Sequence, residues 1–163
     1  MKKWFLIVFC AALVGLILYF VLPPYIANRQ LQQLNTSSLS SLKAVALATV
    51  LYCEDNGDRF PPEFLSNEGL RESLTGYLDK DVKDKSAVFA PKNPDEAVIL
   101  GNKRLAGVMK SSIADKGEAI MLFESKDWAE LDGRNISYAD AHVKFVKPFD
   151  DRMLEVGFEE GYE

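Results

Sequence analysis

An uninterrupted apolar run near the N-terminus constrains this chain more than any other feature of its sequence. Residues 4–22, from Trp4 to Leu22, are 19 residues without a charge. As a helix this run would be roughly 28 Å long at about 1.5 Å per residue, which matches the roughly 30 Å hydrocarbon core of a bilayer. The run therefore predicts a transmembrane anchor over residues 1–24, in contact with membrane lipid.

Two other interpretations of this run fit its sequence less well. Lys2 and Lys3 resemble the basic start of a cleavable signal peptide, but the run ends in Leu22-Pro23-Pro24 without a small-x-small cleavage site. Cys10 would be the modified residue of a lipoprotein, but Phe9 before it is large and the apolar run continues beyond it. Lys2 and Lys3 favour a cytoplasmic N-terminus, so the rest of the chain is expected on the other side of the membrane.

The remaining residues, 25–163, are enough for one compact domain and too few for two domains with separate cores. They carry all 24 Asp and Glu residues and 17 of the 19 Lys and Arg residues, a net charge of −7. This acidic balance argues against nucleic acid as a partner. The two cysteines, Cys10 in the apolar run and Cys53 near the end of the next helical pattern, are too far apart to form a disulfide.

A stalk helix is expected directly after the anchor. Apolar residues recur at three- and four-residue steps and predict a helix from about Tyr25 to Tyr52, within a stalk segment at 25–56. The stripe consists of Leu39, Leu42, Ala46, Val50 and Cys53. Pro23 and Pro24 predict a kink where this helix joins the anchor. A turn cluster at 54–58 ends the helix.

The pattern changes from helix to strand beyond residue 57. Residues 63–78 fit one short amphipathic helix. Short β-type runs follow at 97–100, 105–109, 119–123, 135–139 and 142–146, and they predict a small antiparallel sheet within a loop and sheet region at 57–149. An acidic tail, 150–163, is expected to be frayed and solvated, or to meet a basic partner. The fold class is therefore α+β, a long N-terminal membrane-spanning helix packed on a small antiparallel sheet.

Six short segments stand out in a fixed order along the chain. They are Leu22-Pro23-Pro24, Ser40-Ser41-Leu42-Lys43, the run from Leu51 to Pro62, Leu74-Thr75-Gly76-Tyr77-Leu78, the run from Val88 to Pro94, and the run from Tyr138 to Phe145. In this order and spacing they resemble bacterial type IV pilin-like proteins and type II secretion pseudopilins. The resemblance is greatest to the branch with a prepilin-type N-terminal segment and a C-terminal processing-associated motif.

That motif in the family is a histidine, nine residues, and then Asp-Gly. Asp140 matches its aspartate and His142 follows in the same run, but Glu130 stands where the family has histidine and Ala141 where it has glycine. The resemblance implies a pilin-like fold and a non-enzymatic subunit of a secretion or surface filament system. It also implies a bacterial inner or cytoplasmic membrane, a periplasmic or extracellular domain, and association with itself or with other pilin-like subunits through the N-terminal helix.

The N-terminal segment leaves a second function open. Pilin-like proteins begin with a short basic leader and a glycine and carry a glutamate early in the apolar run, and residues 2–7 contain neither the glycine nor the glutamate. The alternative is a monomeric, membrane-anchored extracytoplasmic binding module that has a pilin-like fold but does not assemble. Cys10 and Gly15, two small residues in the anchor, are consistent with close packing between helices, and equally with ordinary packing against lipid.

Candidate chemistry is sparse in this sequence. His142 is the only histidine, and Asp140 and Ser137 near it lie on one predicted hairpin, which cannot easily supply convergent nucleophile, base and orienting groups. We therefore expect no catalytic site and interpret Asp140 and Ala141 as the turn between the last two strands. No cofactor is expected. The resemblance to type II secretion pseudopilins, which often bind calcium, implies a calcium site with candidate ligands Asp127, Asp132, Asp140, Asp150 and Asp151. These residues match no calcium-loop signature and are otherwise solvated acids.

Overall fold

The chain divides into two compact units. The computed structural model describes residues 2–81, 84–92 and 96–156, with the backbone alone for 2–3, 5–12, 14 and 17. The first unit, residues 1–35, is called the anchor unit here, and the second, residues 36–163, the sheet unit. Helix α1 (Lys2–Asp55) belongs to both units.

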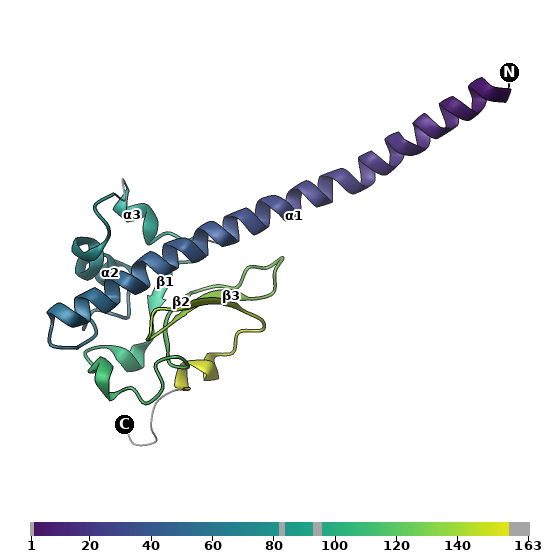
Figure 1. The fold of residues 1–163 in the computed structure, drawn as a ribbon. Coiled ribbons are helices and arrows are strands. Elements are labelled where there is room, and N and C mark those ends of the chain that lie inside the picture. Colours follow the sequence, from purple (N-terminus) through teal and green to yellow (C-terminus); the bar gives the residue numbers. More distant parts are fainter. Residues whose placement is uncertain (1, 82–83, 93–95, 157–163) are drawn as a thin grey trace. The chain divides into compact units, whose positions relative to one another are not determined.

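Helix α1 continues through Pro23 and Pro24 without interruption, and Figure 1 shows no sharp bend there. The kink predicted at the two prolines is therefore wrong. Pro23 and Pro24 cannot donate to the carbonyls of Tyr19 and Phe20 four residues earlier, but both can keep helical backbone angles. The described part of α1 near the N-terminus, within Leu18–Asp55, is long and apolar enough to cross a membrane.

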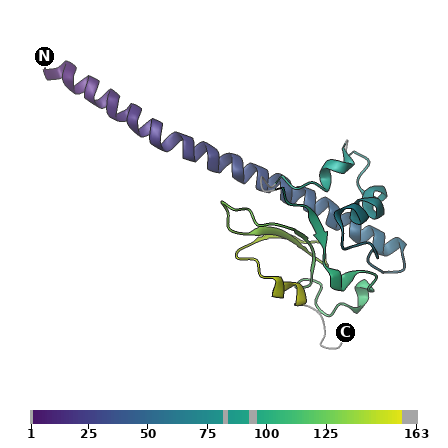
Figure 2. The same cartoon turned by 180° about the vertical axis from the view of Figure 1, so that it is seen from behind.

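The C-terminal part of α1 supplies one layer of the sheet unit. Leu42, Val45, Ala46 and Cys53 are fully buried in the main core, together with residues of the sheet. Figures 1 and 2 show this part of α1 lying along one face of the sheet. The predicted α+β arrangement, a long helix on a small antiparallel sheet, is confirmed. The Cys53 thiol is free, and its burial raises its pKa to about 11.

The sheet has four antiparallel strands in the order β1-β2-β3-β4. They are β1 (Ile99–Gly101), β2 (Ile120–Glu124), β3 (Arg134–Tyr138) and β4 (Val143–Val146). A bulge lies between Ile120 and Leu122, where the register of β2 against β3 shifts. Each strand pairs with its neighbour in sequence, as expected where apolar runs are separated by turns.

The face of the sheet that α1 does not cover carries a second, smaller core. Ile120, Ile136 and Val146 are buried there, and Met153 and Leu154 of the 3₁₀ helix η4 (Asp151–Glu155) pack against them. The prediction of a frayed tail from residue 150 is therefore wrong for 151–155, because this segment has two apolar residues to bury. Residues 157–163 lie outside the described part of the chain.

The helix predicted at 63–78 is shorter in the structure. Helix α2 (Asn67–Leu74) begins after Ser66, whose hydroxyl accepts from the Gly69 amide at 2.9 Å. Gly69 is required there, because a Cβ would lie 2.4 Å from the Glu63 carbonyl oxygen. A 3₁₀ turn, η1 (Thr75–Tyr77), follows, and then α3 (Lys85–Val88), which was not predicted. Asn93 and Pro94, at the end of one segment of the resemblance, are outside the described residues.

The strand predicted at 105–109 does not form. Two 3₁₀ turns, η2 (Lys103–Leu105) and η3 (Lys110–Ser112), flank residues 106–109 instead, and Met109 makes an isolated bridge to Arg59. The buried Asn102 side chain accepts from the Arg104 amide at 3.1 Å, and Gly107 has φ +71°. The side-chain hydrogen bond of Asn102 and the left-handed backbone of Gly107 are both incompatible with a regular strand, although the apolar pattern of the run fits one.

Candidate functional site

The β3–β4 hairpin carries the residues that the sequence singled out. Its turn closes through hydrogen bonds from the Tyr138 amide to the His142 carbonyl (2.9 Å) and from the Ala141 amide to the Tyr138 carbonyl (2.8 Å). The Asp140 carboxylate accepts from the His142 amide at 2.9 Å. Asp140 and Ala141 thus form the turn between the last two strands, as the sequence predicts.

Neighbouring elements hold this turn in place. The Lys43 ammonium of α1 donates to the Ala141 carbonyl at 2.5 Å. The Ala139 amide donates to the Ala119 carbonyl at 2.9 Å, at the start of β2. The turn is therefore a fixed part of the sheet unit and not a free loop tip.

Ala141 adopts φ +67°, a left-handed conformation that costs a residue with a Cβ about 1–2 kcal/mol. We expect Ala141→Gly to raise the free energy of unfolding by about 0.5–1 kcal/mol, since relief of strain outweighs the lost burial of one methyl group. Ala139→Gly is the matched control, because Ala139 is equally buried in the same turn but lacks a positive φ. It should lower stability by about 1 kcal/mol. Urea unfolding measures both, and destabilisation by Ala141→Gly would contradict the prediction.

Asp140 and His142 form a close pair beside Tyr138. The Asp140 Oδ1 to His142 Nδ1 distance is 2.6 Å, and the His142 ring stacks on the Tyr138 ring with centroids 4.0 Å apart. Partial burial raises the pKa of the Asp140 carboxyl, but hydrogen bonds from the His142 backbone and ring outweigh it and hold that pKa below its ordinary value of 3.8. Burial and the charges of Glu118 and Asp140 raise the pKa of the Tyr138 phenol.

Acid should destabilise the sheet unit through its aspartates. Hydrogen bonds from Ser111 are the chief cause of a lowered pKa at Asp58. The pKa of Asp140 is lowered too, by its hydrogen bonds from His142. A carboxyl group whose pKa is lower in the folded than in the unfolded state stabilises the fold at any pH above its unfolded pKa, here 3.8. This stabilisation is lost as the pH falls through the folded pKa. We expect the melting temperature to fall below about pH 4. Asp58→Asn with Asp140→Asn should flatten this dependence, whereas Glu72→Gln, at an exposed position on α2, should not.

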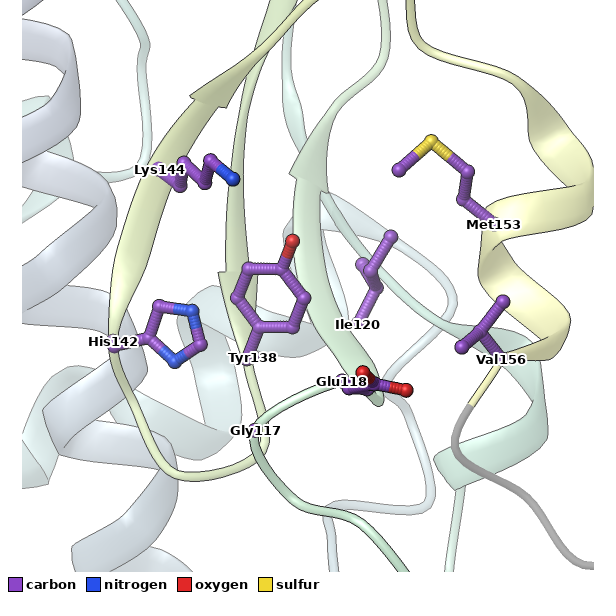
Figure 3. A pocket seen from close by; sticks show the side chains of 8 residues that line it. All are labelled: Gly117, Glu118, Ile120, Tyr138, His142, Lys144, Met153 and Val156. Atoms are coloured by element: carbon purple, nitrogen blue, oxygen red, sulfur yellow. The ribbon is translucent and has the colours of Figure 1, made fainter.

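A pocket of about 360 Å³ opens beside the hairpin on the face of the sheet that η4 partly covers (Figure 3). Tyr138 stands at its centre, with His142 and Lys144 from the β4 side and Glu118 and Ile120 from the β2 side. Met153 and Val156, from η4 and the residue after it, form the opposite wall. The pocket combines apolar side chains with an ammonium, a carboxylate, an imidazole and a phenol, a composition suited to a small polar ligand.

Glu130 does not join this site. It is exposed in the loop before β3, whereas Asp140 follows the other end of that strand. Five strand residues separate the two ends by about 16 Å. The histidine position of the family motif and its Asp-Gly position thus lie at opposite ends of β3.

The calcium candidates are not brought together. Asp127 pairs with Arg134 at 2.7 Å, Asp150 with Arg152 at 2.5 Å, and Asp140 with His142. Asp132 occupies a left-handed turn position, and Asp151 lies in η4. Within residues 2–81, 84–92 and 96–156, no group of three or more acidic, histidine or cysteine side chains could hold a metal.

The predicted anchor residues all lie on α1. Trp4 and Leu22 are exposed in the anchor unit, and an added Cβ at Gly15 would meet nothing within 4 Å. The Cys10 side chain lies outside the described part. Helix packing through Cys10 and Gly15 stays a prediction.

A buried cluster surrounds Glu124, at the end of β2, and it was not predicted from the sequence. The Glu124 side chain is fully buried, and its carboxylate accepts from the Ser38 hydroxyl of α1 (2.5 Å) and from the Trp128 indole nitrogen (2.6 Å). The Asn135 side-chain amide donates to it at 3.1 Å and the Asn135 backbone amide at 3.4 Å. Donors from α1, from β3 and from the loop between β2 and β3 thus converge on one carboxylate. The only sequence signal was a glutamate closing an apolar strand, with a tryptophan four residues later.

In comparisons with known proteins, no family model, curated protein or solved structure matched this chain.

Proposed function

We propose that this protein is a non-enzymatic, membrane-anchored pilin-like or pseudopilin-like subunit that acts in assembly of a secretion or surface filament system. Its N-terminus is cytoplasmic in a bacterial inner or cytoplasmic membrane, and its sheet unit is periplasmic or extracellular. Lys2 and Lys3 before the apolar run support this orientation.

The observation that carries the proposal is the surface of α1 in the anchor unit. Leu18, Tyr19, Phe20 and Val21 are between 50 and 74% exposed, and four consecutive residues point in different directions around the helix. A helix that is apolar all round needs an apolar surrounding. The same helix then provides a layer of the sheet unit, so that one element is both membrane anchor and structural helix of the domain, as the pilin-like resemblance implies.

The geometry of the hairpin supports a role without catalysis. Asp140 and His142 pair at the turn, but Ser137, the nearest serine in sequence, is buried on the other face of β3. Its hydroxyl donates to the Tyr138 carbonyl at 3.4 Å. A nucleophile and its base must be within hydrogen-bond reach, and strand alternation places these two on opposite faces.

Assembly can be tested by shearing cells that express the full-length protein and examining the released fraction by negative stain. We expect filaments that contain the protein. The variant Leu47→Arg with Leu51→Arg should stay in the membrane but be lost from filaments, because both leucines are 47% exposed on α1 in the sheet unit and charge there opposes helix packing. Glu54→Gln with Asp55→Asn, on the same exposed end of α1, is the control. Complete retention of the wild type as a membrane monomer would contradict assembly.

One observation favours the second candidate, a monomeric anchored binding module. The pocket beside the hairpin presents an ammonium and a carboxylate toward solvent, and residues 2–22 contain no carboxylate to pair with a neighbouring subunit. Retention as a monomer in the shearing experiment would select this function.

A further inference from the structure

The pocket beside the hairpin holds two opposite charges that are not paired. Lys144, on β4, and Glu118, two residues before β2, both line it. Across the described ranges 2–81, 84–92 and 96–156, neither side chain has an ion-pair partner. A ligand that carries both a negative and a positive group would complement them.

The strand register sets the separation of these charges. Lys144 lies opposite Ile136 of β3, and Ile120 of β2 lies opposite Tyr138. Glu118 lies about four residues further along β3 than Lys144, so the backbones that carry them are about 10 Å apart across the sheet and about 13 Å apart along it, which is about 16 Å in all. The Lys144 and Glu118 side chains both reach into the pocket and cover much of this distance. Two extended peptide residues span about 7 Å and can bridge the remaining gap between the two charges, whereas the adjacent charges of a single amino acid cannot.

The rest of the pocket suits a peptide with an apolar side chain. Ile120, Met153 and Val156 provide an apolar wall opposite the Tyr138 ring (Figure 3). The Tyr138 ring is held in place by its stack on the His142 ring. The His142 ring is itself held by Asp140, whose Oδ1 lies 2.6 Å from His142 Nδ1. A preformed apolar wall beside a fixed aromatic ring lowers the cost of ordering the site on binding.

We propose that this pocket binds a short, zwitterionic peptide of about two residues, with its amino terminus at Glu118 and its carboxylate at Lys144. The Tyr138 hydroxyl is available to donate to the same carboxylate, and the apolar side chain packs against Met153. This goes beyond the proposed function and does not depend on whether the protein assembles.

Calorimetry on the full-length protein in lipid nanodiscs, with the dipeptide Ala-Leu as the probe, tests the proposal. We expect saturable binding with a Kd on the order of 0.1–1 mM. Glu118→Gln and Lys144→Met should each raise the Kd by about tenfold or more, because each removes a charge-assisted hydrogen bond. Glu72→Gln and Lys103→Met make the same chemical changes at exposed positions outside the pocket and should leave the Kd unchanged.

Blocked peptides assign each end of the ligand. Acetylation of the amino terminus should weaken binding to the wild type but not weaken it further in Glu118→Gln. Amidation of the carboxyl terminus should weaken binding to the wild type but not weaken it further in Lys144→Met. The absence of saturable heat up to about 10 mM peptide overturns the proposal. Equal losses in the two control variants, or blocked peptides that bind the wild type as well as Ala-Leu does, overturn it too.

Discussion

Replacing Glu124 with alanine should lower the free energy of unfolding of the sheet unit by about 3 kcal/mol or more. The Glu124 side chain is fully buried, and its two oxygens are the acceptors for the Ser38 hydroxyl and the Trp128 indole. Alanine would leave these donors buried without an acceptor, at about 1–3 kcal/mol each. Thermal unfolding of the detergent-solubilised full-length protein, followed by near-ultraviolet circular dichroism, measures the loss.

Two other glutamate variants sharpen this prediction. Glu118→Ala, at an exposed position before the same strand, should change stability by less than about 0.5 kcal/mol. Glu124→Gln should fall between the wild type and Glu124→Ala, because glutamine keeps one acceptor oxygen while its amide group meets a donor. A Glu124→Gln variant as stable as the wild type would show that a second acceptor oxygen is not needed.

The link from Glu124 to α1 can be measured separately. Ser38→Ala should cost about 1.5–3 kcal/mol in the wild type, since it removes a hydrogen bond to a charged group. In the Glu124→Ala background the same change should cost much less, because the acceptor is already gone. Equal costs in the two backgrounds would show that the bond between Ser38 and Glu124 contributes nothing.

Two arginines in the middle of the apolar run should abolish membrane retention. The variant Leu13→Arg with Leu16→Arg changes two exposed side chains of the anchor unit. Each arginine at the centre of a transmembrane helix costs about 2.5–3.5 kcal/mol on insertion scales. We expect the double variant to leave the membrane pellet after ultracentrifugation of lysed cells.

The control for this experiment lies on the same helix. Leu47→Arg with Leu51→Arg places the same charges on exposed leucines of the sheet unit and should leave the protein in the membrane. Because the two double variants have the same composition, a difference between them reports position alone. Release of both variants from the membrane pellet would show that general misfolding, and not loss of the anchor, causes the release.

The sequence predicted those parts of the fold in which local pattern and packing agree. The stripe of Leu42, Ala46 and Cys53 indicated a helix with one buried face, and these residues are buried in the core. Strands β2, β3 and β4 lie where short apolar runs are bounded by turn residues. The hairpin turn at Asp140 was also found, because Asp in a short break between strands has a local mechanism.

What the sequence could not predict depends on partners far apart in the chain. The run from Leu105 to Met109 looks like a strand, but the Asn102 cap and the backbone of Gly107 exclude one. The Glu124 cluster joins Ser38, Trp128 and Asn135, which no periodicity connects. The pocket was missed for the same reason, since it needs η4 to pack beside Tyr138.

The separation of Ser38 from Glu124 by 86 residues has a consequence for biosynthesis. A ribosome adds about 5–20 residues per second, so roughly 4–17 s pass between these two residues. During that interval the apolar stripe of α1 has no sheet to cover it, while the anchor before it can already enter the bilayer. On the proposed membrane-anchored function, the nascent chain therefore waits at the membrane surface with its future core open to water, and a holding chaperone would have the greatest effect at this stage.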